Sequence, residues 1–249
     1  MNNIKTTIDI QKSLQIIKDF KPFETPIFND GNEDAFRYIL WNLYFRVSEA
    51  IKSYVVLFEN ERYYDSFIIA GHCLETCAIL SYIKDNPTPE LCRERYNKYF
   101  ASATIGRLKA CLGLEDNLEK EIAWQAYVSL LKLFYPVGKY IVKEKDKEKY
   151  EEIIKQINYR LGLNKEKIEI LGKHFVSIKV NEYMKAFIKN TAYFDGEQFN
   201  KFYKKYCDVK HSNMITPGAS FEINTFEYFA EDGIMLLLGI IYYLKDFKF

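Results

Sequence analysis

Apolar residues recur at intervals of three and four along most of the chain, which is the spacing of an amphipathic helix. The clearest run contains Phe36, Ile39, Leu40, Leu43, Val47, Ala50, Ile51, Tyr54, Val55 and Phe58. With only 11 glycines and 6 prolines in 249 residues, long elements are favoured over many short strands. The sequence therefore predicts an all-α protein. We expect residues 1–249 to form a single helical bundle-like domain of about eight or nine helices.

Helix boundaries follow from the breakers and capping residues. Asp85, Asn86 and Pro87 should end the helix that begins near Tyr64. Thr88 and Pro89 supply an N-cap and a first-turn proline for the next one. The remaining helices are expected over 117–135, 144–161, 165–190 with a break near Gly172, 196 to 207 or beyond, and from a capping box at 224–227 to about 245.

Two long apolar runs resemble membrane spans. The run Gly233 to Leu244 is too short for a bilayer, which needs about 20 residues. The run Ser66 to Ile83 would place His72 and Glu75 near the middle of a bilayer, at a cost of several kcal/mol. Both runs are therefore expected to be core helices of a protein that does not enter a membrane.

Charge and cysteine content narrow the functional classes. Lys and Arg total 35 against 34 acidic residues, so an extended DNA-binding surface is not expected, whereas a small RNA site is compatible with this balance. The five cysteines show no disulfide spacing, and the first residues show no signal peptide, so a cytoplasmic protein with reduced thiols is expected. No cofactor is expected, because phosphate-loop, nucleophile-elbow and zincin motifs are absent from the sequence.

The first candidate site is His72 and Glu75, three residues apart on one side of the apolar helix. A carboxylate in such a run is costly to bury, so Glu75 should have a cationic or hydrogen-bond-donating partner from another helix. The structural alternative is a buried pair of Glu75 with Arg46 or with His72 itself.

The second candidate is the segment 203–213, which carries three lysines, a histidine and short polar residues before a Pro-Gly loop. Functional side chains often lie where a helix meets a loop. The alternative is an ordinary helix C-terminus, at which Lys and His complement the helix dipole. A zinc site built from Cys73, Cys77, Cys207 and His211 is disfavoured, because buried cysteine usually behaves as a small apolar residue.

An acidic residue on a buried helix and a later basic-x-His segment together resemble the HEPN superfamily of helical bacterial proteins. The family motif is Arg, four to six residues, then His. His211 fits the histidine, while Lys205 or Lys204 stands where the arginine belongs, so the planar phosphate clamp of arginine is missing. Some related helical proteins carry Arg-x-x-x-Glu on the central helix, where this chain has Gly71 and Glu75.

The resemblance implies metal-independent RNA cleavage by a homodimer, in a toxin–antitoxin or anti-phage system. It implies that His211 takes the proton of a ribose 2′-hydroxyl, that Lys205 or Lys210 stabilises the charged phosphate, and that Glu75 or Asp208 orients the histidine. The candidate catalytic residues are His211, Lys205, Lys210, Glu75 and His72, and the candidate RNA-binding residues are Lys204 and Asn213.

Two functions remain open. One is a HEPN-like ribonuclease or toxin with RNA and an antitoxin as partners, and the other is a catalytically silent helical protein-interaction module. Convergence of Glu75, His72 and the 204–213 segment would favour the ribonuclease. The apolar last helix has to be enclosed, either by the other helices or by a second copy of the chain, and this adds to the expectation of a homodimer.

Overall fold

The structure of the 249-residue chain is a computed structural model. The structure describes residues 9–24, 32–111, 116–133, 143–149, 151–153, 178, 180–190, 196–210 and 226–247, with the side chains of a few helical residues left out.

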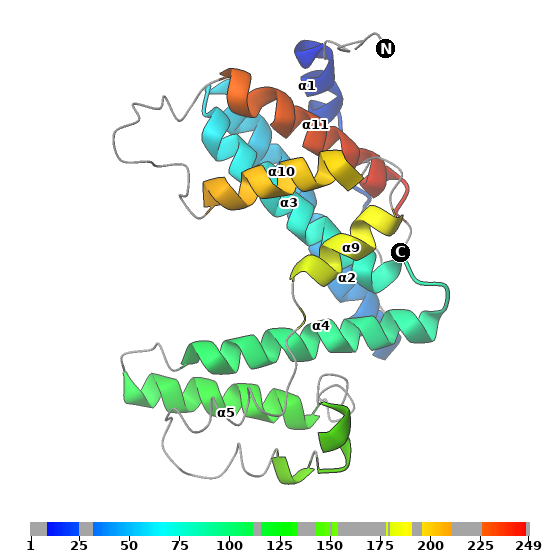
Figure 1. The fold of residues 1–249 in the computed structure, drawn as a ribbon, viewed down its shortest axis with the longest axis vertical. Helices are drawn as coiled ribbons and strands as arrows, with labels where there is room; N and C mark the ends of the chain where they lie inside the picture. The colour runs from blue at the N-terminus through cyan, green and yellow to red at the C-terminus, as the bar shows by residue number, and fades with distance from the viewer. Residues whose placement is uncertain are drawn as a thin grey trace. The chain divides into compact units, whose positions relative to one another are not determined.

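Helices account for all the regular structure in these ranges (Figure 1). The α-helices are α1 (Ile10–Lys18), α2 (Asn32–Glu59), α3 (Tyr63–Lys84), α4 (Pro89–Ala110), α5 (Asn117–Leu133), α9 (Val180–Asn190), α10 (Gly196–Lys210) and α11 (Phe226–Lys245). One 3-10 helix, η2, spans Glu144–Lys149. The all-α prediction is confirmed.

The contacts of the chain fall into two compact units. The first comprises Met1–Asp85 with Val180–Phe249, and the second comprises Asn86–Lys179. In the first unit α3 packs against α2, α9, α10 and α11, whereas in the second α4 packs against α5 (Figure 1). A single domain over residues 1–249 stays a prediction.

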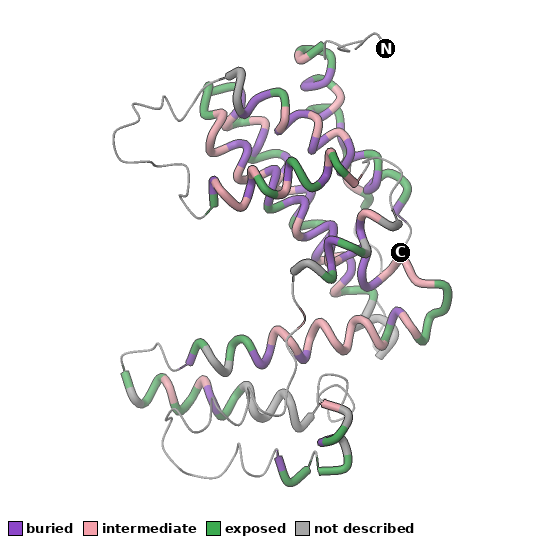
Figure 2. Tube along the Cα trace, viewed as in Figure 1, coloured by how far each residue is buried: buried purple, intermediate pink, exposed green. Residues whose placement is uncertain are grey.

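Helix α3 forms the centre of the first unit and is buried along most of its length (Figure 2). It is the one helix of the described residues that is long and apolar enough to cross a membrane, and 72% of its most apolar window is buried inside the protein. This burial is typical of a core helix. Small residues such as Ala70, Gly71 and Ala78 lie among the buried positions and let neighbouring helices approach closely.

Helix α11 is also enclosed within the first unit. Ile234, Leu236, Leu237, Ile240 and Ile241 are all fully buried, and α11 packs against α3, α1 and α2. The chain itself therefore covers the apolar surface for which a second copy had been considered.

Several predicted boundaries agree with the structure. Helix α3 ends at Lys84 and α4 begins at Pro89, and the Thr88 hydroxyl accepts a hydrogen bond from the Leu91 N–H at 3.3 Å, as an N-cap does. The capping residues proposed before α11 lie outside the described residues, apart from the backbone of 226–227.

Other boundaries differ. Helix α1 was not predicted, although Ile10, Leu14 and Ile17 have helical spacing and Asp9 caps the Lys12 N–H at 3.0 Å. Residues 144–149 form a 3-10 helix where an α-helix was expected; this six-residue segment is composed only of charged residues and has no apolar stripe to pack. The helix expected over 165–190 does not run through residue 178, because α9 begins at Val180.

Candidate functional site

Helix α10 lies against the middle of α3, and the contact depends on a glycine. A Cβ atom placed on Gly71 would lie 2.0–2.4 Å from three ring atoms of Tyr206. The ring therefore rests directly on the α3 backbone. It belongs to a buried cluster with Phe67, Val209 and Phe229, which fixes its position from the other sides.

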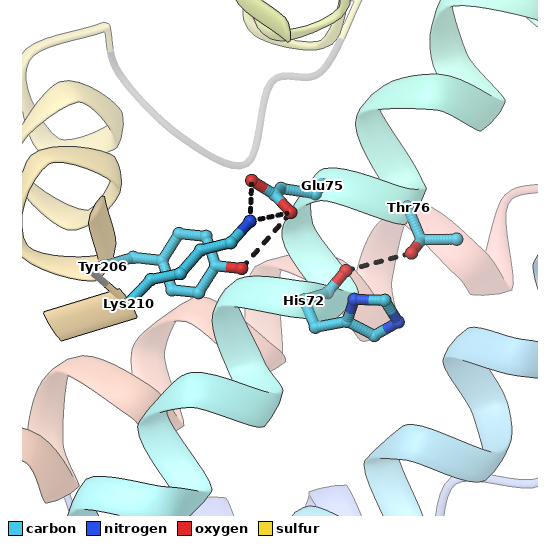
Figure 3. Close-up of polar contacts among 5 residues, drawn as sticks. All are labelled: His72, Glu75, Thr76, Tyr206 and Lys210. Atoms are coloured by element: carbon cyan, nitrogen blue, oxygen red, sulfur yellow. Dashed lines mark hydrogen bonds and ion pairs between the residues drawn. The ribbon is translucent and has the colours of Figure 1, made fainter. Parts of the chain in front are cut away.

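The hydroxyl of Tyr206 points along α3 to Glu75, one helical turn beyond Gly71 (Figure 3). It donates a hydrogen bond of 3.2 Å to Glu75 Oε2. The ammonium of Lys210 lies 3.1 Å from Glu75 Oε2 and 3.2 Å from Oε1, so it contacts both carboxylate oxygens. The predicted partner from another helix is confirmed, and two residues of α10 share this role.

Lys210 also lies over the face of the Tyr206 ring, with Nζ 5.3 Å from the ring centroid. At this distance the negative face of the ring attracts the cation. Tyr206 therefore contacts both members of the ion pair. The side chains of Lys210 and Glu75 are 43% and 20% exposed, so the pair borders solvent and does not lie in the core.

The last turn of α10 has a further anchor on α3. The hydroxyl of Tyr64 donates a hydrogen bond of 3.2 Å to the carbonyl of Val209. This bond satisfies one of the carbonyl groups that a helix C-terminus leaves without an intrahelical partner. Lys210 is the last described residue before His211, so the chain is fixed to α3 directly before the predicted histidine.

The electrostatics of the pair favour a protonated Tyr206. Burial, and then the negative charge of Glu75, raise the pKa of Tyr206 well above that of free tyrosine. The pKa of the neighbouring Tyr203 is raised as well, chiefly by burial. The Tyr206 hydroxyl therefore acts as a hydrogen-bond donor to the carboxylate over the whole physiological pH range.

Lys205 lies in a different cluster, between α10 and α11. Its ammonium is 2.7 Å from Asp232 Oδ2, and both side chains are largely buried. The same ammonium lies 5.4 Å from the ring centroid of Phe67 and 5.2 Å from that of Phe229. The structure thus brings Lys210 to Glu75 and Lys205 to Asp232, because the two lysines point to different sides of α10.

The other predicted residues are placed as follows. His72 is exposed, and its imidazole turns away from the Glu75 carboxylate (Figure 3). Arg46 is exposed on α2. The partners of Glu75 are Tyr206 and Lys210, and not His72 or Arg46 as the buried-pair alternative had it. Lys204 is exposed on α10. His211 and Asn213 lie outside the described residues.

No group of three or more His, Cys, Asp or Glu side chains suited to a metal ion occurs within the described ranges. Cys73 and Cys77 are fully buried on α3. Burial raises the pKa of Cys73 to about 12, which opposes formation of the thiolate that a metal would need. The arrangement around Glu75 instead offers a fixed carboxylate and a half-exposed ammonium.

Sequence reasoning missed Tyr206 and the role of Gly71. Two signals were present: Tyr206 lies four residues before Lys210, on the same helix face. A glycine inside an apolar helix also often marks a close approach of another element.

Comparison with protein-family models, with curated proteins and with solved structures finds no match to this chain.

Proposed function

We propose that the protein is a HEPN-like, metal-independent ribonuclease that acts as a toxin in a bacterial defence or toxin–antitoxin system. The observation that supports this proposal is the contact of Glu75 with Lys210, the residue directly before His211. An acidic residue of the central helix and the basic end of a late helix meet, as the HEPN resemblance implies. The role of His211 rests on the sequence alone.

In this proposal His211 removes the proton of a ribose 2′-hydroxyl. The 2′-oxygen then attacks the adjacent phosphorus, and the bond from phosphorus to the 5′-oxygen breaks. The products are a 2′,3′-cyclic phosphate and a 5′-hydroxyl, whose proton the imidazolium supplies. Lys210, half-exposed beside Glu75, is the ammonium best placed to stabilise the phosphate charge. Lys205 is less suited to this role because its side chain is only 13% exposed, against 43% for that of Lys210.

Glu75 has two roles in this scheme. It holds Lys210 in position while RNA is absent, and it orients the segment that carries His211. Lys204, exposed on α10, would contact RNA phosphates further along the strand, together with Asn213. The proposal needs no metal ion. A homodimer and an antitoxin partner belong to it through the family resemblance.

The test is cleavage of a mixed RNA substrate by the purified chain in EDTA. Wild-type protein should cleave RNA, and His211→Ala should not. Glu75→Gln should lower the rate at least tenfold, because the ion pair and its orientation are lost. Glu49→Gln is the matched control, since it removes a carboxylate that pairs with Lys52 on the exposed side of α2, at 2.6 Å, in the same unit.

A wild-type protein that leaves RNA intact would overturn the proposal, as would equal activity of Glu75→Gln and Glu49→Gln. Analytical ultracentrifugation tests the dimer separately: sedimentation only as a 29.5 kDa monomer at micromolar concentration would remove the dimer from the proposal.

The alternative function is a catalytically silent module that binds a protein partner. One observation favours it, a row of aromatic side chains on α2. Tyr38 and Phe45 are 47% and 39% exposed. Trp41 lies between them, with ring centroids 6.2 Å from Tyr38 and 5.1 Å from Phe45. Exposed aromatic groups of this kind are enriched in protein interfaces. If wild-type protein fails to cleave RNA and Phe45→Ala abolishes binding of a partner, this alternative is preferred.

A further inference from the structure

Tyr206 contacts the Glu75–Lys210 pair in two chemically different ways. Its hydroxyl donates to Glu75 Oε2 at 3.2 Å, and its ring face lies 5.3 Å from Lys210 Nζ. A carboxylate on a helix surface ordinarily samples several rotamers, and so does a lysine ammonium. Here one rigid aromatic side chain restricts both groups. Hydrogen bonds to a charged group are stronger than those between neutral groups, which favours this one orientation of the Glu75 carboxylate.

The position of Tyr206 is itself fixed. The ring fills the space above Gly71, where any Cβ atom would overlap it, and it is 2% exposed. Phe67 of α3 and Phe229 of α11 belong to the same buried cluster. Gly71 and Glu75 are four residues apart on one side of α3, and the ring that rests on Gly71 places its hydroxyl beside the Glu75 carboxylate.

We infer that Tyr206 is a positioning residue of the candidate site, which holds the Glu75 carboxylate and the Lys210 ammonium in one fixed geometry. The expected effect of Tyr206 on the rate of RNA cleavage rests on the proposed function. The fixed geometry of Glu75 and Lys210 does not depend on that function. Tyr206 does not touch the reacting atoms. It acts by keeping Glu75 in one orientation, so the loss of its hydroxyl should lower the rate of the chemical step and leave substrate binding unchanged.

Tyr206→Phe separates the hydroxyl from the ring. The phenylalanine ring still fills the space above Gly71 and still offers its face to Lys210, so α10 should stay docked on α3. Only the hydrogen bond to Glu75 is removed. A carboxylate that loses a hydrogen-bond donor becomes more nucleophilic and less ordered. It should therefore react faster with a carbodiimide in the presence of glycine ethyl ester.

Mass spectrometry of the labelled protein compares three carboxylates. In Tyr206→Phe the labelling rate of Glu75 should rise about twofold to tenfold, which is the factor that one net hydrogen bond contributes to an equilibrium. Glu49, on the exposed side of α2, is the reference for general reactivity. Asp232 reports on docking, because it pairs with Lys205 of α10 and would become more reactive if α10 loosened.

A rise at Glu75 alone supports the inference. Faster labelling of both Glu75 and Asp232 would show that Tyr206 only holds α10 in place. An unchanged labelling rate of Glu75 would show that the hydroxyl does not restrain the carboxylate. Either result overturns the inference. For RNA cleavage, Tyr206→Phe should lower kcat about tenfold with KM unchanged. An increase in KM with kcat unchanged would also overturn the positioning role. If wild-type protein cleaves no RNA, the proposed function fails while the labelling result still decides the inference.

Discussion

Replacing Gly71 by alanine tests the packing on which the candidate site depends. The new methyl group would lie 2.0 Å from Tyr206 Cδ2, 2.3 Å from Cε2 and 2.4 Å from Cγ, all far inside van der Waals contact. The clash involves the base and middle of the ring, so a small movement of its far end cannot relieve it. Tyr206 is buried in one cluster with Phe67 and Phe229, so the ring is confined on its other sides and the added methyl group should push α10 away from α3.

The expected change in the free energy of unfolding has three parts. Overpacking of a filled core costs about 1–3 kcal/mol. Loss of the Tyr206 hydrogen bond to Glu75 adds about 1 kcal/mol, less than for a buried charge because the Glu75 side chain is 20% exposed. The higher helix propensity of alanine compared with glycine stabilises the folded state by about 1 kcal/mol. The sum is a destabilisation of about 2 kcal/mol, which lowers Tm by about 4–8 °C for a chain of this size.

Urea unfolding followed by far-ultraviolet circular dichroism measures this change. Gly106→Ala is the control: Gly106 is exposed inside α4 and nothing lies within 4 Å of its added Cβ, so this variant should gain about 0.5–1 kcal/mol. In a Tyr206→Leu background the ring is absent, and Gly71→Ala should no longer destabilise. Equal destabilisation by Gly71→Ala in both backgrounds would refute the role assigned to the ring.

Three further predictions concern the first unit. The buried Tyr54 hydroxyl lies 2.9 Å from a Cβ placed on Gly233, so Tyr54→Phe should convert Gly233→Ala from destabilising to neutral or stabilising in urea unfolding. Burial raises the pKa of Asp85 above 3.8, so the folded state binds the proton more tightly than the unfolded state. The unfolding free energy of wild type relative to Asp85→Asn should therefore increase as the pH falls from neutral through the raised pKa, and a difference that is constant with pH would contradict this. At pH 8 a thiol reagent should modify the half-buried Cys207 at least tenfold faster than Cys73, whose pKa burial raises to about 12, and peptide mapping would detect the reverse order.

The helical class, most boundaries and the central place of α3 could be predicted from the sequence. These properties are local: apolar spacing of three and four residues places one face of each helix toward a core, and Thr88 with Pro89 starts a helix wherever that helix later packs. The need of Glu75 for a partner also followed from the sequence, because the cost of burying a carboxylate depends only on its apolar surroundings. Helix α1 was missed although its cap and its spacing were present.

The partners of Glu75 depended on the tertiary structure. Local spacing favoured His72, yet the carboxylate meets Tyr206 and Lys210, which are 131 and 135 residues away in the chain. Contacts over such distances are decided by which helices pack and by how closely they approach. At Gly71 the absence of a Cβ atom lets the Tyr206 ring reach the α3 backbone. The sequence assigned no packing role to this glycine, whereas in the folded chain it lets the helix that carries Lys210 lie directly against α3 beside Glu75.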